Sequence, residues 1–127
     1  MSLPRFYPVF DSAAWVARAV PLGVKLVQLH IKDAPEEVLR AEITTALDLC
    51  RQHGALLVVN DHWQLAIELG ADWLHLGQED LDSANIPAIR AAGLKLGLST
   101  HDHAELDRAL ALAPDYIALG PVYPTIL

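Results

Sequence analysis

Short apolar runs alternate with longer stretches in which apolar residues recur at helical spacing. The runs predict strands at Phe6–Phe10, Leu26–Ile31, Leu56–Val59, Trp73–Leu76, Lys95–Ser99 and Tyr116–Leu119. The intervening stretches predict helices over Ala13–Val20, Pro35 to about His53, Trp63–Leu69, Ile86–Ala92 and Glu105–Ala113. Each helix is therefore expected to connect two strands.

The strands recur at steps of roughly 20 residues, which is typical of βα units in a parallel sheet. The preferred architecture is an α/β fold of the TIM (β/α)8-barrel type, with about six of the eight βα units present. A full barrel takes about 200 residues or more, so the barrel is expected to be incomplete. The alternative is an open, doubly wound sheet. Without a long linker, residues 1–127 are expected to form a single domain.

Composition narrows the function classes. The chain has 127 residues, a formal net charge of −7 and 53% hydrophobic residues, so it can build a core. An acidic chain without a basic stripe is not expected to bind nucleic acid. No apolar run reaches the roughly 18 residues of a membrane span, and the first residues do not resemble a secretion signal. The single Cys50 fits a reducing compartment. A cytoplasmic location is therefore expected.

Polar residues gather where the predicted strands end. Strand alternation places Gln28, His30 and Lys32 on one face, and the next two strands are followed by Asn60-Asp61 and by Gln78-Glu79-Asp80. The carboxyl ends of parallel strands face the ligand in such folds. Asp61 and Asp80 are therefore expected to converge on one hard cation such as Mg²⁺, with room for a phosphorylated substrate.

Two further clusters follow the last two strands: Ser99-Thr100-His101, and Gly120-Pro121 with Thr125 beyond it. Together, these clusters resemble the motifs of the thiamine phosphate synthase (thiamine-phosphate pyrophosphorylase) family. In this chain they read Gln-Leu-His-Ile-Lys from Gln28, Asn60-Asp61, Leu-His-Leu-Gly-Gln-Glu-Asp up to Asp80, Ser99-Thr100-His101, and Gly-Pro-Val-Tyr-Pro-Thr up to Thr125. The resemblance extends from Tyr7 to Thr125.

The resemblance implies a barrel that couples 4-amino-2-methyl-5-hydroxymethylpyrimidine diphosphate with a thiazole phosphate and releases diphosphate. The implied residue roles are as follows. Gln28, Lys32 and Asn60 hold the diphosphate, with His30 in the same set, and Asp61 and Asp80 ligate Mg²⁺. Ser99 contacts the pyrimidine, and Thr125 reaches the thiazole phosphate. Such chemistry needs neutralisation of the departing charge rather than a nucleophile or a general base.

The chain departs from the family pattern in two places. His30 stands where the family has an Arg. A permanent cation is thereby replaced by a group that titrates near pH 6.5, so weaker binding of diphosphate is expected. The chain also ends at Leu127, where the family continues with a second Thr, a Lys and two more strands.

Two alternative functions remain open on the sequence alone. One is the thiazole tautomerase of the same superfamily, for which His101 is the supporting residue. The other is a non-catalytic truncated barrel that acts as a binding or assembly module. An unclosed barrel leaves two sheet edges, so a homo-oligomer or a complementing C-terminal fragment is expected. His75, inside the fourth predicted strand, is expected either to pack and position a neighbour or to contact a ligand.

Overall fold

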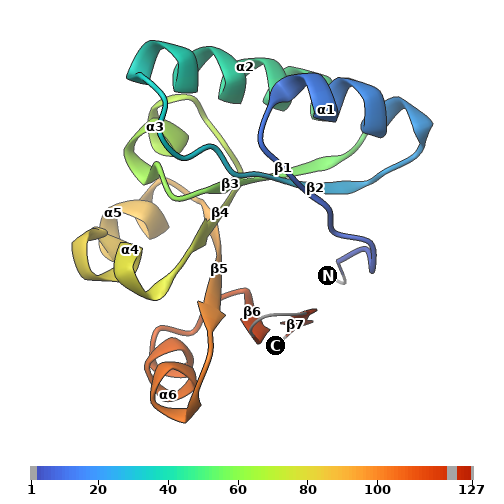
Figure 1. Ribbon diagram of the computed structural model, residues 1–127. Helices are drawn as coiled ribbons and strands as arrows, with labels where there is room; N and C mark the ends of the chain where they lie inside the picture. Colours follow the sequence, from blue (N-terminus) through green and yellow to red (C-terminus); the bar gives the residue numbers. More distant parts are fainter. Residues whose placement is uncertain (1–2, 120–122, 127) are drawn as a thin grey trace.

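The sheet curls so that its helices lie on the convex side and both chain ends lie on the concave side (Figure 1). The computed structural model describes residues 3–119 and the backbone of residues 123–126. The strands are β1 (Val9–Phe10), β2 (Leu26–Leu29), β3 (Leu56–Asn60), β4 (Trp73–Leu76), β5 (Lys95–Thr100), β6 (Tyr116–Leu119) and β7 (Tyr123–Ile126). The helices are α1 (Ala13–Ala19), α2 (Glu36–Gln52), α3 (Trp63–Glu68), α4 (Gln78–Ser83), α5 (Ile86–Ala91) and α6 (His103–Ala111), with a 3₁₀ turn at Val20–Leu22.

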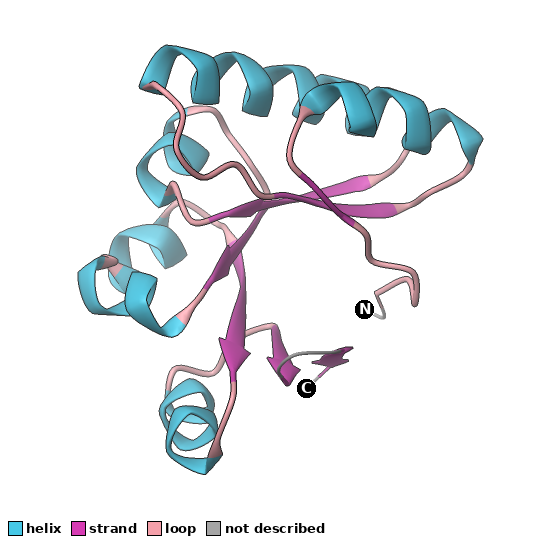
Figure 2. Cartoon of the chain, viewed as in Figure 1, coloured by secondary structure: helices cyan, strands magenta, loops and turns pink. Residues whose placement is uncertain are grey.

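The strands lie in the sheet in the order in which they occur in the chain, and β1 to β6 are all parallel. A doubly wound sheet reverses its strand order at a switch point, and this sheet does not. The arrangement is therefore that of a barrel opened along one side (Figure 2), which confirms the predicted fold class.

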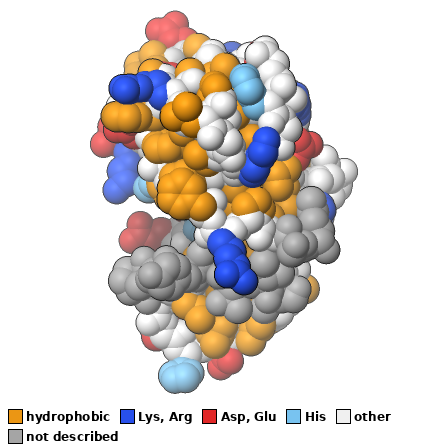
Figure 3. All heavy atoms as spheres, turned by 90° about the vertical axis from the view of Figure 1, so that its right-hand side faces the viewer, with side chains coloured by type: hydrophobic (Ala, Val, Ile, Leu, Met, Phe, Trp, Pro, Cys, Tyr) orange, Lys and Arg blue, Asp and Glu red, His pale blue; other side chains and the backbone are white. Residues whose placement is uncertain are grey.

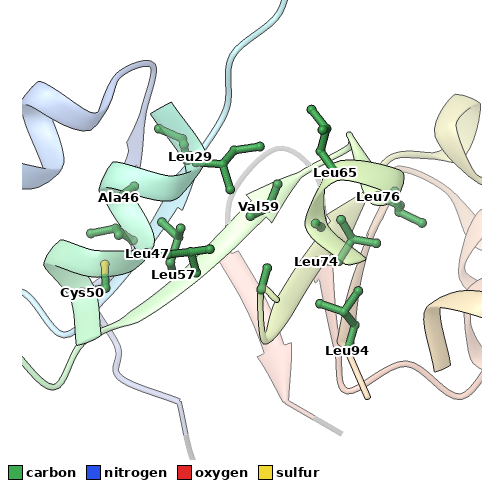
Figure 4. Close-up of a cluster of buried hydrophobic side chains, with 14 of the residues drawn as sticks. Leu29, Ala46, Leu47, Cys50, Leu57, Val59, Leu65, Leu74, Leu76 and Leu94 are labelled. Carbon is green, nitrogen blue, oxygen red and sulfur yellow. The ribbon is translucent and has the colours of Figure 1, made fainter. Parts of the chain in front are cut away.

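The main hydrophobic core lies between the convex face of the sheet and the helices (Figure 4). Its strand residues are every second residue of β2 to β6, as alternation requires. Helix α2 contributes one apolar stripe, whose buried residues are Leu39, Ile43, Ala46, Leu47 and Cys50. Because side chains alternate along a strand, the residues between these core positions point to the concave face.

The concave face carries a smaller apolar cluster near the starts of the strands. Leu26, Val58, Trp73 and Tyr116 form it, with Tyr7 packed against them. Figure 3 shows the molecule from the side toward which the sheet opens, and hydrophobic side chains gather over the upper half of this view. The same face becomes polar toward the strand ends, where Gln28, Asn60, His75 and Ser99 occupy the next inward-facing positions.

Two elements differ from the sequence-based expectation. Gln78–Asp80 begins helix α4 rather than a loop, because the Asp80 carboxylate accepts a hydrogen bond from the Gly77 N–H (2.9 Å) and stabilises the first helical turn. A seventh strand, β7, pairs antiparallel with β6. The polar sequence of α4 and the prolines near β7 concealed both elements.

Candidate active site at the strand ends

A pocket of about 490 Å³ lies at the carboxyl ends of the parallel strands. We call it the strand-end pocket. Its lining residues are His30, Ile31, Lys32, Asp33, Asn60, Asp61, His62, Gly77, Glu79, Asp80, Ser99 and His101. Its volume falls within the range of small-molecule sites, about 300–1,000 Å³.

The backbone after β3 bends sharply at Asp61 and His62. Both adopt left-handed conformations, with φ of 57° and 38°, which are uncommon for residues other than glycine. Two contacts hold the bend: the Asp61 N–H donates to the His75 carbonyl (2.8 Å), and His62 Nε2 lies 2.8 Å from the Ile31 carbonyl oxygen. The bend places Asp61 on the pocket wall next to Asn60. Such local strain is typical of functional sites.

Asp61 and Asp80 line the same pocket, although they come from different strand ends. One Asp80 oxygen, Oδ2, accepts the Gly77 N–H, and the other remains available to a ligand. Among the described residues, neither Asp61 nor Asp80 forms an ion pair, and no three His, Cys, Asp or Glu side chains form a ready-made metal site. Two carboxylates fit Mg²⁺, which usually binds one or two carboxylates and takes further oxygens from substrate phosphates.

Of the predicted site residues, Lys32 and His30 are the two with basic side chains that line the pocket. Lys32 forms no ion pair within the described part of the chain. Desolvation lowers the pKa of His30, and the Lys32 charge lowers it further, against the opposing effect of Asp80. His30 is therefore mainly neutral at pH 7, and Lys32 carries the permanent positive charge.

Beneath the pocket, six side chains form a continuous set of hydrogen bonds, which we call the inner network. Asn60 Nδ2 donates to Gln28 Oε1 (3.0 Å), and Gln28 Nε2 donates to Tyr7 Oη (2.9 Å). The two hydroxyls of Tyr7 and Tyr116 are 2.7 Å apart. Tyr116 Oη lies 2.7 Å from His75 Nδ1, and His75 Nε2 lies 2.6 Å from Ser99 Oγ. Both ends of the network, Asn60 and Ser99, reach the pocket wall.

The register of the sheet explains how Tyr116 reaches His75. His75, Gly97 and Tyr116 are paired in one row across β4, β5 and β6. A Cβ atom on Gly97 would overlap the Cζ and Cε1 atoms of the Tyr116 ring. The missing side chain therefore lets the ring cross β5 and stack on the His75 ring, with centroids 5.6 Å apart.

Burial sets the protonation states in the network. It lowers the pKa of His75 to about 4, because the charged imidazolium is disfavoured away from water; His30 lowers it further and Asp80 opposes the shift. Burial raises the pKa of Tyr7 to about 12 and raises that of Tyr116 as well. At neutral pH the network thus consists of a neutral imidazole and two protonated phenols.

The structure brings most of the predicted site residues together. His30, Lys32, Asn60, Asp61, Asp80 and Ser99 all line the strand-end pocket. Gln28 is buried (6% exposed) and lies below the pocket, where its amide joins Asn60 to Tyr7. Thr125 lies in β7, and its side chain is outside the described part of the structure.

Sequence reasoning missed Tyr7 and Tyr116 as part of the site. Each lies in a predicted apolar strand, because a tyrosine among apolar residues shows no sign of a polar partner. Gly97 inside a strand was the available signal, since such a glycine often marks a close approach.

Comparisons with known proteins agree with this geometry. The family model described as thiamine monophosphate synthase matches residues 6–127. A thiamine-phosphate synthase of Rhizobium etli is 64% identical over 127 residues, which are 100% of this chain and 62% of that protein. One of Serratia proteamaculans is 53% identical over 119 residues, 94% of this chain and 56% of that protein. The chain therefore spans about three-fifths of the length of these relatives.

A solved structure shares the fold. The thiamine phosphate pyrophosphorylase of Pyrococcus furiosus superposes with a TM-score of 0.81 at 28% identity, covering 94% of this chain and 61% of that one. Both relatives from Rhizobium etli and Serratia proteamaculans carry the synthase name, so the tautomerase and assembly-module alternatives are not favoured.

The fold and the pocket define a protein of the (β/α)-barrel class whose strand ends present two carboxylates beside a lysine. The family match then places it within that class. The chain belongs to the thiamine monophosphate synthase family, a family of transferases in thiamine biosynthesis.

Proposed function

We propose that the chain binds the pyrimidine methyl diphosphate in the strand-end pocket and couples it to a thiazole phosphate, with release of diphosphate. The observation that carries the proposal is the joint placement of Asp61, Asp80 and Lys32 around one pocket. A diphosphate leaving group is highly charged, and an acidic chain needs a cation to accept it.

Mg²⁺ would be held by Asp61 and by the second Asp80 oxygen, and when bound it would neutralise charge on the diphosphate. Lys32 would contact the diphosphate oxygens, with His30 and Asn60 beside it. Ser99, on the next strand end, would meet the pyrimidine ring. Thr125 is assigned to the thiazole phosphate on the family resemblance alone.

Titration calorimetry with inorganic diphosphate and Mg²⁺ tests the metal assignment. Asp61→Ala and Asp80→Asn should each abolish the Mg²⁺-dependent part of binding. Asn at position 80 can still accept the Gly77 N–H, so this variant removes the charge and retains the helix cap. The matched control is Asp82→Ala, on the same helix, since Asp82 pairs with Arg108 instead of lining the pocket. Unchanged affinity in both site variants would exclude the two aspartates as ligands.

Formation of thiamine phosphate from the two precursors tests the coupling reaction. The assay is run on the purified chain alone and together with the part of the Rhizobium etli relative that the chain does not span. Product that depends on Asp61 in either assay supports the proposal. No product in both assays, despite Mg²⁺-dependent binding, would restrict the chain to ligand binding.

The same proposal includes association and location. Within the described part of the chain, the outer strands β1 and β7 pair with one strand each, and unpaired strand edges favour association. We therefore expect a homo-oligomer or a complex with a complementing fragment, measurable by sedimentation. A cytoplasmic location fits the buried, free Cys50, whose pKa burial raises to about 11. Within residues 3–119 and 123–126, no helix has the length and apolar character needed to cross a membrane.

A further inference from the structure

The inner network connects both walls of the strand-end pocket, and its hydrogen bonds can be ordered from donor to acceptor. Tyr7 Oη accepts from Gln28 Nε2, so its single proton needs another acceptor. Among the described residues, that acceptor is Tyr116 Oη. The Tyr116 proton then has His75 Nδ1 as its acceptor. In the reverse order, the Tyr7 proton would be buried without a hydrogen-bond acceptor, which is unfavourable.

The order has a chemical consequence at the far end. A neutral imidazole whose Nδ1 accepts carries its proton on Nε2. His75 Nε2 then donates to Ser99 Oγ at 2.6 Å. The Ser99 hydroxyl forms no other hydrogen bond with the described residues, so its proton is left to point elsewhere. Ser99 lines the pocket, so its proton is directed at whatever occupies that space.

We propose that Tyr7, Tyr116 and His75 are positioning residues that fix Ser99 as a hydrogen-bond donor toward an acceptor atom of the bound substrate. Resting on the proposed function, this inference specifies a substrate with a lone pair at that point, such as an aromatic ring nitrogen, and disfavours a group that itself donates. His75 acts through Ser99 and does not line the pocket.

Two features support a fixed order. The raised pKa values of Tyr7 and Tyr116 keep both phenols protonated near neutral pH, and the lowered pKa of His75 keeps its imidazole neutral, with a single proton on the ring. No buried side-chain polar atom among the described residues lacks a hydrogen-bond partner, so within the network the Ser99 proton is left for a ligand. A satisfied buried network holds its members in one arrangement.

The tautomer of His75 gives a direct test that requires no substrate. Long-range ¹H–¹⁵N correlation spectra of the labelled chain at pH 7.5 should show His75 with a protonated Nε2 and an unprotonated Nδ1. Protonated Nδ1 would overturn the proposal, because Ser99 would then be the donor to His75 and would present a lone pair to the pocket. If the amide oxygen and nitrogen of Gln28 and Asn60 were exchanged, Tyr7 would donate to Gln28 and the hydrogen bonds of the network would run in the reverse order. The same spectrum would detect this reversal.

Two matched variants test whether the Tyr116 hydroxyl determines the tautomer of His75. Tyr7→Phe leaves the Tyr116 hydroxyl with His75 Nδ1 as its acceptor, so the Nε2–H tautomer should persist. Tyr116→Phe removes the donor to Nδ1, so the ¹⁵N shifts of His75 should move toward the average of the two tautomers. An unchanged tautomer in Tyr116→Phe would show that the network does not set it. The wild-type spectrum decides the donor order even if a variant does not fold.

A binding cycle tests the link to the substrate. With the pyrimidine methyl diphosphate and Mg²⁺, Tyr116→Phe should weaken binding about fivefold when Ser99 is present. The same change should have no effect in a Ser99→Ala background. An equal loss in both backgrounds would overturn the role of Ser99 as the point of action. Absence of binding in the wild type would refute the proposed function, whereas the tautomer measurement would still decide the donor order.

Discussion

The buried, neutral state of His75 predicts how the stability of the chain depends on pH. His75 is 5% exposed, and burial lowers its pKa from 6.5 to about 4. Between these two values the unfolded chain binds a proton at this residue and the folded chain does not. The contribution of neutral His75 to the free energy of unfolding is therefore fully present above pH 6.5 and is lost as the pH falls toward 4.

The size of this stability loss follows from the change in the pKa of His75. One proton bound only in the unfolded state changes the free energy of unfolding by about 1.4 kcal/mol per pH unit. Over the interval from 6.5 to 4, the loss reaches about 3 kcal/mol, a large part of the stability of a small domain. The charged groups that act on His75 are His30, which lowers its pKa, and Asp80, which raises it.

Urea denaturation from pH 4 to 8 in a metal-free buffer measures this effect. His75→Asn should reduce the pH slope of the unfolding free energy by about 1.4 kcal/mol per unit between pH 6.5 and 4. The control is His103→Asn, which removes an exposed imidazole at the start of α6. Coincident slopes for the wild type and His75→Asn would refute the neutral, buried state of His75.

Three further predictions concern other parts of the structure. Gly97→Ala should lower stability by about 3 kcal/mol and shift the Tyr116 ring signals in NMR spectra, because a Cβ atom would displace the ring; unchanged stability would contradict the close approach. His30→Arg should tighten Mg²⁺-diphosphate binding roughly tenfold at pH 8 in calorimetry. Because the pKa of His30 is lowered, this gain should diminish only below pH 6.5, and a gain that persists undiminished to pH 4 would place His30 away from the diphosphate. Asn85→Ala should cost about 1 kcal/mol in thermal denaturation, since Asn85 accepts the Ala88 N–H at the start of α5.

The sequence predicted the barrel class because its signals were periodic. The parallel strands β2 to β6 are short apolar runs, so these runs identified the strands, and their recurrence at steps of roughly 20 residues identified the fold. Helix α4 was missed because a six-residue polar helix has almost no apolar face to reveal it. Strand β7 pairs with the preceding strand β6 as a local hairpin, with Leu119 opposite Tyr123, and it was missed because Pro124 lies within its sequence and a proline argues against a strand.

The acidic part of the site could be predicted from the sequence, and the inner network could not. Asp61 and Asp80 are polar residues at strand ends, and parallel strands bring such residues to one pocket. The contact of Tyr116 with His75 depends instead on a two-strand separation and on the absence of a side chain at Gly97. These conditions appear only once the register is known.

The position of the inner network explains why a polar cluster is tolerated inside the sheet. It occupies the boundary between the apolar cluster at the strand starts, which contains Trp73 and Tyr116, and the strand-end pocket. An unpaired polar group at this depth would destabilise the fold, and a fully apolar layer would leave nothing to orient Ser99. Tyr116 meets both requirements, since its ring joins the apolar cluster and its hydroxyl joins the network. The order of the site is therefore established by folding, before any ligand binds, and loss of the Tyr116 hydroxyl should lower stability as well as ligand recognition, because it removes one hydrogen-bond partner from each of Tyr7 and His75.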